Sequence, residues 1–136
     1  MLAIVHTPPV VSTICDAVVG TIVPSTDVAP PPLVGDVAPG AVGTEVDRVA
    51  RTVIEEAGLG ARFGHGLGHG VGLEVHEAPW LNPELESTLA VGNVVTVEPG
   101  VYISGLGGIR IEDLVILGED GPDVLTDYTK ELVVVG

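Results

Sequence analysis

Three histidines lie close together in the stretch FGHGLGHGVGLEVHEAP: His65, His69 and His76. Two histidines four residues apart suit a zinc site on a helix, but HGLGH has no glutamate after its first histidine, and its glycines disfavour a helix. In an extended chain, positions four apart lie on one face. His65 and His69 are therefore expected to point together into one site, and the alternative is that the histidines belong to the core.

Two apolar runs downstream, VVTVEPGVYI (94–103) and GIRIEDLVIL (108–117), predict strands that carry charged residues. Valines and isoleucines occupy alternate positions, so Glu98, Arg110 and Glu112 share the opposite, concave face. Carboxylates within an apolar strand need a cation, and both Arg110 and a metal ion are candidates. Taken alone, the two strands fit a structural arginine–glutamate pair as well as a metal site.

Imidazole and carboxylate ligands together suit manganese, cobalt, zinc or iron. Several carboxylates around one or two histidines are what a two-metal hydrolase needs, because ions about 3.5–4 Å apart activate a bridging water and polarise a scissile carbonyl. Such a site requires more ligands than His69, Glu98 and Glu112 supply.

The run TEVDRVARTVIEEAGLG, which starts at Thr44, predicts a helix packed on the sheet. Thr44 is expected to cap it in a capping-box relation with Asp47, and Gly58 to end it in the left-handed conformation. Arg51 and Glu55 are spaced as an i,i+4 ion pair. One apolar stripe recurs at helical spacing: Val46, Val49, Ala50, Val53, Ile54 and Ala57.

The predicted fold class is α+β, a curved antiparallel sheet with a helix packed on one face. Further strands are expected at ICDAVVGTIV (14–23) and ELVVV (131–135). Most of the eleven prolines fall within residues 1–40, where they permit only short strands and turns. A length of 136 residues fits a single domain.

Composition excludes some partners. A formal charge of −14 with only five basic residues argues against nucleic acid and against binding to an anionic membrane. Cys15 is the only cysteine, so no intramolecular disulfide can form and a reducing compartment fits. The N-terminus lacks the basic region of a signal peptide, and a cytoplasmic location is expected.

The motifs GHGLGHGVGLEVHEAP, VVTVEPGVYI and GGIRIED together resemble the C-terminal part of the Xaa-Pro dipeptidase and aminopeptidase P branch of the pita-bread metallopeptidases. Methionine aminopeptidases are more distant relatives. The resemblance implies a partial pita-bread fold. Residues 38–136 would form the C-terminal half of the catalytic domain, and residues 1–37 a degenerate, proline-rich remnant of its first half.

The resemblance implies metal ligands residue by residue. His69, Glu98 and Glu112 fall on three of the family's five ligand positions, with Glu98 also handling protons and Glu112 bridging two ions. Asp16 and Asp27 keep the spacing of the other two, although the residues between them depart from the family pattern. Two divalent ions are implied, manganese first and cobalt or zinc as alternatives, and at most one if Asp16 and Asp27 are not ligands.

The resemblance also implies substrate contacts. His65 matches a histidine lining the substrate pocket, His76 one that stabilises the tetrahedral intermediate, and Arg110 a basic residue beside the bridging glutamate. The implied reaction is hydrolysis of an Xaa-Pro bond in a small peptide with proline second, and a homodimer is compatible with it. A catalytically inactive remnant or metal- or peptide-binding module remains the alternative, and a structural acidic domain a third.

Overall fold

The computed structural model describes residues 32–128 of the chain. The helical elements are α2 (Pro32–Asp36), α3 (Gly43–Glu56) and the 3-10 turn η1 (Gly60–Arg62). The strands are β1 (Gly68–Gly70), β2 (Glu77–Leu81), β3 (Val94–Val97), β4 (Gly100–Ile103), β5 (Gly107–Arg110), β6 (Asp113–Gly118) and β7 (Gly121–Val124). The strands expected at 14–23 and 131–135 lie outside the described residues.

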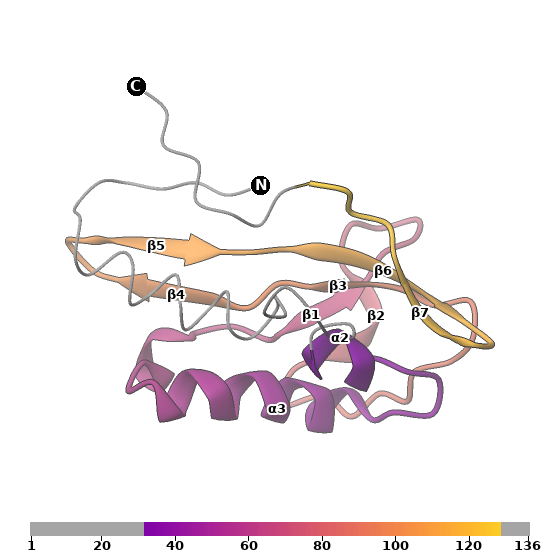
Figure 1. Ribbon diagram of the computed structural model, residues 1–136, viewed down its shortest axis with the longest axis horizontal. Coiled ribbons are helices and arrows are strands. Elements are labelled where there is room, and N and C mark those ends of the chain that lie inside the picture. Colours follow the sequence, from indigo (N-terminus) through magenta and orange to yellow (C-terminus); the bar gives the residue numbers. More distant parts are fainter. Residues whose placement is uncertain (1–31, 129–136) are drawn as a thin grey trace.

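All strand pairs among the described residues are antiparallel, in a five-stranded sheet of order β2-β1-β3-β6-β7 and a two-stranded ladder of β4 and β5. Figure 1 shows β3 running on into β4, and β5 into β6, as one long ribbon above α3. With α3 against this ribbon, the predicted α+β class, an antiparallel sheet with a packed helix, is confirmed.

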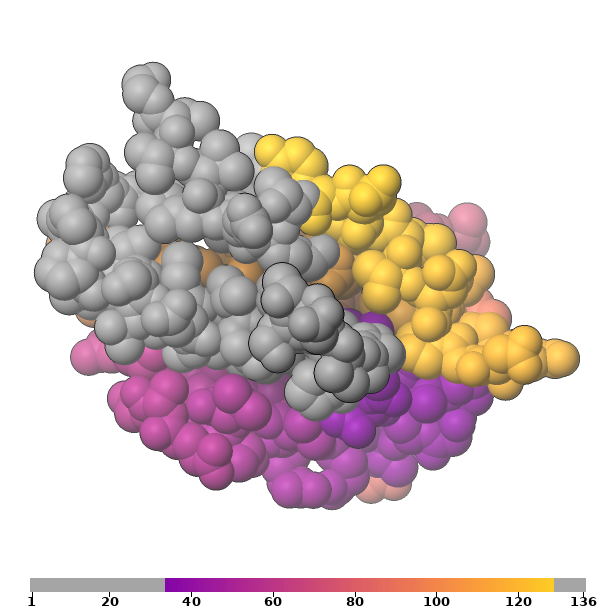
Figure 2. Space-filling view, viewed as in Figure 1, coloured from indigo at the N-terminus to yellow at the C-terminus, as the bar shows by residue number. Residues whose placement is uncertain are grey.

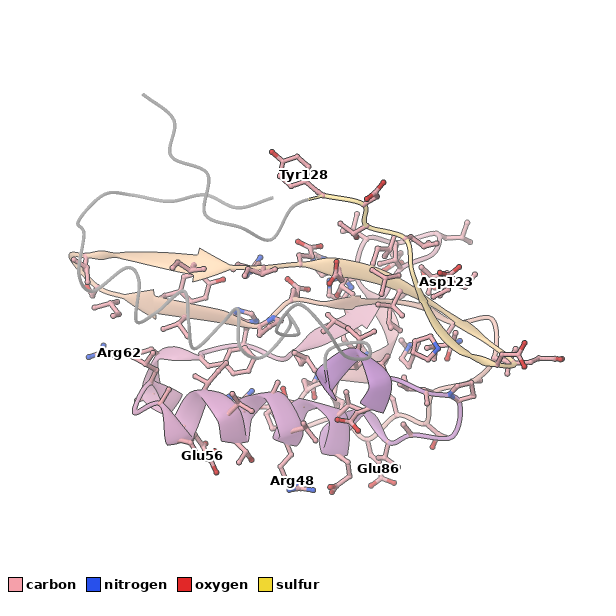
Figure 3. All side chains as sticks on the ribbon, viewed as in Figure 1. Arg48, Glu56, Arg62, Glu86, Asp123 and Tyr128 are labelled. Atoms are coloured by element: carbon pink, nitrogen blue, oxygen red, sulfur yellow. The ribbon has the colours of Figure 1, made fainter. Side chains whose placement is uncertain are left out.

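Helix α3 packs through one apolar face because its valines, alanine and isoleucine recur at helical spacing. Val46, Ala50 and Ile54 are buried, whereas Val53 of the predicted stripe is 36% exposed. Figure 3 shows Arg48 and Glu56 pointing away from the sheet. In the space-filling view of Figure 2, α3 lies along the lower side, and the end of the described chain, in yellow, lies at the right.

Strand alternation is as predicted. Val95 and Val97 are fully buried with the helix residues in the core, and Ile109 and Ile111 of the partner strand segment are buried in the same core. The polar residues of the same strands therefore have to emerge on the other face.

Residues 32–37 pack with the rest of the described chain, since Val34 and Val37 belong to the buried core. The expected division of the chain near residue 37 stays a prediction. No helix within 32–128 is long and apolar enough to cross a membrane.

The predicted cap of α3 is wrong. The helix begins at Gly43, its N-cap is Val42, and no side chain caps it. Tertiary contacts set this start, because Gly43 N–H donates to the Ser87 carbonyl (2.8 Å) and a Cβ at Gly43 would collide with the Trp80 carbonyl. The predicted end is confirmed, with Gly58 at φ +76°.

The predicted Arg51–Glu55 pair is also wrong. Arg51 instead pairs with Asp47, one turn earlier, at 2.9 Å. Both carboxylates are four residues from Arg51, and burial decides between them, because Asp47 is 1% exposed whereas Glu55 lies on the exposed side of the helix.

We expect Thr44→Ala to change the free energy of unfolding by less than about 0.5 kcal/mol, because Thr44 is not the cap. Removal of a capping side chain would cost about 1 kcal/mol. Gly58→Ala is the matched comparison and should cost about 1–2 kcal/mol, since its φ is left-handed. Urea unfolding of both variants checks this, and a larger loss for Thr44→Ala would contradict the observed helix start.

Candidate active site

His69 on β1 and Glu98 at the end of β3 meet on the face away from the core. Nε2 of His69 lies 3.0 Å from Oε1 of Glu98, and each side chain is 11% exposed. The intervening Thr96 ties both: its hydroxyl donates to Glu98 Oε1 (2.9 Å) and accepts the backbone N–H of His69 (3.1 Å). Sequence reasoning missed this role of Thr96, although a strand period of two puts Thr96 on the same face as Glu98.

Glycines on either side of His69 let three strands approach one another. A Cβ at Gly68 would collide with the Thr96 carbonyl on β3, and one at Gly70 with the Ala78 carbonyl on β2. Only glycine, which has no Cβ, leaves room for the neighbouring backbone at these two positions.

Each histidine of HGLGH is fixed by the glycine after it. Nδ1 of His69 lies 2.9 Å from the Gly70 carbonyl, and Nδ1 of His65 lies 2.7 Å from the Gly66 carbonyl. A carbonyl oxygen only accepts, so each Nδ1 carries a proton. In a neutral ring Nε2 then presents a lone pair, the arrangement that metal-binding histidines use.

The His69–Glu98 contact fits a cation site. A lone pair on Nε2 facing a carboxylate oxygen at 3.0 Å places two acceptors together, so a proton or a metal ion has to lie with them. Two ligand atoms held about 2.0–2.2 Å from one ion are about 3 Å apart at right angles. The nitrogen and oxygen donors suit the metals expected from the sequence.

Strand register brings the third predicted ligand opposite Glu98. The β3–β6 ladder pairs Val97 with Asp113 and the β4–β5 ladder pairs Gly100 with Arg110. Extending either ladder across the interruption pairs Glu98 with Glu112. Directly opposed carboxylates repel unless a cation lies near them.

The side chains do not complete that ligand set. Glu112 is exposed. Within residues 32–128, no group of three or more histidine, cysteine, aspartate or glutamate side chains is arranged to hold a metal ion. Asp16 and Asp27 lie outside the described part of the chain, so their role as ligands stays a prediction, as does that of Glu112.

A second cluster adjoins Glu98. Arg110 NH1 lies 3.4 Å from Glu98 Oε2, and its NH2 lies 3.5 Å from Nε2 of His65. The same Nε2 lies 3.2 Å from the hydroxyl of Tyr102. Sequence reasoning missed Tyr102, although its position four residues after Glu98 on an extended chain indicates a shared face.

His65 reaches this cluster from outside β1, which begins at Gly68. The two histidines of HGLGH therefore do not share one strand as the extended-chain argument assumed, although both lie near Glu98. His76 reaches the site from the loop after β1, and its ring centroid is 4.3 Å from that of His69.

Comparison with known proteins identifies relatives of this chain. Residues 33–119 match metallopeptidase family M24. The Xaa-Pro dipeptidase of Pyrococcus furiosus is 50% identical over 95 residues, which cover 70% of this chain and 27% of that protein. Over this shared part the likeness is therefore close.

Solved structures extend the likeness to the fold. The prolidase of Pyrococcus horikoshii OT3 superposes with a TM-score of 0.82 at 38% identity, covering 96% of this chain and 35% of that one. The X-Pro aminopeptidase of Thermotoga maritima MSB8 gives a TM-score of 0.83 at 37% identity, covering 98% and 36%. The antiparallel sheet is thus part of the pita-bread fold of prolidases.

The chain spans about a quarter of the length of the curated relative and about a third of these structures. The family match covers more than half of the chain and includes all three motifs that bring His69, Glu98 and Arg110 together. The chain belongs to metallopeptidase family M24.

Proposed function

We propose that this chain forms part of a metal-dependent peptidase that hydrolyses Xaa-Pro bonds, of the proline dipeptidase or Xaa-Pro aminopeptidase type. The observation that carries the proposal is the buried contact between His69 Nε2 and Glu98 Oε1, with Arg110 on the other carboxylate oxygen. A nitrogen donor, a carboxylate and a guanidinium at one point can hold a cation and a peptide together.

His69, Glu98 and Glu112 would hold the metal, with Asp16 and Asp27 completing a two-ion site. Peptidases of this family depend on metal ions, and we propose manganese, with cobalt or zinc as alternatives. Bound there, the cations would supply Lewis-acid chemistry and an activated water. The side chain of Glu112 would have to turn toward Glu98, which its opposed register allows.

Glu98 would accept a proton from the attacking water and pass it to the leaving proline nitrogen. Thr96 holds Oε1 of this carboxylate by donating its hydroxyl, so the orientation of the carboxylate is set before substrate binds. His76 stands beside His69 on an exposed loop and would donate to the oxyanion that forms at the carbonyl.

Arg110, His65 and Tyr102 would bind the peptide, in which proline stands second. The Arg110 side chain is 43% exposed, and its ion-pair distance to Glu98 is a long 3.4 Å. Part of its guanidinium therefore remains able to pair with a peptide carboxylate. Hydrogen bonds from Tyr102 and Arg110 converge on His65 Nε2 and orient the imidazole.

The test is hydrolysis by the purified chain with added manganese. Leucyl-proline should be cleaved, leucyl-alanine should be cleaved far more slowly, and EDTA should stop the reaction until manganese is restored. Glu86→Gln, at an exposed glutamate on the helix side of the molecule, should behave as the wild type. Equal cleavage of both dipeptides would contradict the specificity for proline, and cleavage in EDTA the metal requirement.

A second candidate is a module that binds metal or peptide without hydrolysing it. One observation favours this module: among the described residues, His69 and Glu98 are the only two predicted ligands that contact each other. Calorimetric titration with manganese separates the two candidates. Two tight sites per chain support the peptidase, whereas one weak site supports the module.

The homodimer, the cytoplasmic location and the exclusion of nucleic-acid and membrane partners stay predictions from composition and family likeness. Gel filtration with light scattering would test the first.

A further inference from the structure

Helix α3 is joined to the histidine segment by a buried ion pair that the proposed chemistry does not use. Asp47 is 1% exposed, and both of its carboxylate oxygens accept hydrogen bonds from Arg51, at 2.9 and 3.0 Å. A buried carboxylate needs such partners. Asp47 has one more, because the backbone N–H of Leu67 donates to its Oδ1 at 2.9 Å.

Arg51 also donates two hydrogen bonds to the backbone around His65. NH1 donates to the Phe63 carbonyl (3.0 Å) and NH2 to the His65 carbonyl (2.9 Å). Its guanidinium carbon also stands 4.3 Å from the centre of the Phe63 ring. That ring meets the His65 imidazole edge-on, with centroids 5.1 Å apart, so one arginine contacts both the backbone and the ring neighbour of His65.

The same pair reaches Glu98 through a single residue. Leu67 donates its N–H to Asp47, and its carbonyl accepts the N–H of Glu98 at 2.7 Å. One turn of α3 is therefore connected by hydrogen bonds to the backbone of His65 and, through Leu67, to the backbone of Glu98.

We propose that Asp47 and Arg51 are positioning residues that set where His65 and Glu98 stand in the site. The inference rests on the proposed function for what the site does, but not for the contacts themselves. His65 lies between Gly64 and Gly66, residues that restrict the backbone least, so its placement requires ties from outside the segment.

A role in stability alone explains this pair less well. Replacing a buried ion pair with apolar residues is often neutral or stabilising, so such a pair is weak evidence for stability. The planar fork of arginine matches four acceptors here, and lysine, a point charge with three donors, cannot reproduce that geometry.

The test compares Arg51→Lys with Arg48→Lys, since Arg48 pairs with Glu45 on the exposed side of the same helix. In Arg51→Lys we expect about tenfold faster hydrogen exchange at the Leu67 amide and a shifted His65 imidazole resonance. If the protein is a peptidase, KM should rise about tenfold or more, with a smaller change in kcat because Glu98 keeps its side-chain partners.

Arg48→Lys should match the wild type in every readout. If Arg51→Lys does not fold, the double variant Asp47→Leu, Arg51→Met takes its place, and it should fold while showing the same displaced His65 resonance. Identical exchange at Leu67 and identical His65 resonances in the Arg51 and Arg48 variants would overturn the inference. A wild type without metal binding or hydrolysis would instead overturn the proposed function, and the exchange and resonance data would still decide the positioning role.

Discussion

Glu98→Gln is expected to abolish hydrolysis of leucyl-proline while leaving the protein folded. Glutamine has the shape of glutamate and keeps an oxygen to accept the Thr96 hydroxyl, which lies 2.9 Å from Oε1. It loses the negative charge and the ability to take up a proton. Loss of proton transfer alone lowers rates about 10²–10⁴-fold.

Metal affinity should fall with activity, because the amide is a poorer ligand beside His69 than the carboxylate. The fold should survive, since the partner left behind, Arg110, is 43% exposed and can be solvated. Turnover and manganese affinity are to be measured with the thermal midpoint, with Glu86→Gln as the control. Turnover equal in the two variants would remove Glu98 from the chemistry.

Local alternation was enough to predict which side chains share a face. In VVTVE and GIRIE the period of two placed Glu98 and Arg110 together, and they are 3.4 Å apart. Glu98 lies opposite Glu112 because the β3–β6 ladder and the β4–β5 ladder keep the same register across the interruption between them. The strands and the face that carries their charged residues could thus be predicted from the sequence.

Contacts between distant segments could not be predicted in this way. The start of α3 depends on the Ser87 and Trp80 carbonyls, more than thirty residues away. The choice of Asp47 over Glu55 by Arg51 depends on which carboxylate is buried against Leu67. Spacing along the helix cannot distinguish Asp47 from Glu55, because each is four residues from Arg51.

Gly68→Val is expected to cause the largest loss of stability among single changes in the histidine segment. Gly68 has no room for a side chain, since its Cβ would lie on the Thr96 carbonyl of the neighbouring strand. The obstacle is backbone held in the sheet, so it cannot rotate away as a side chain end would. Overpacking of this kind costs about 1–3 kcal/mol and occasionally more.

Displacing β1 from β3 would also separate His69 from Thr96, whose hydroxyl accepts the His69 N–H, and from Glu98. Manganese binding should therefore weaken even in the fraction that folds.

Gly64→Ala is the matched control, because a Cβ at Gly64, in the same segment, would meet nothing within 4 Å. It should change the free energy of unfolding by less than about 0.5 kcal/mol. Urea unfolding and calorimetric titration of both variants give the comparison. Equal stability and equal manganese affinity would mean that the glycine beside His69 is not needed to seat β1 against β3, and the argument that packing places this imidazole at Glu98 would fail.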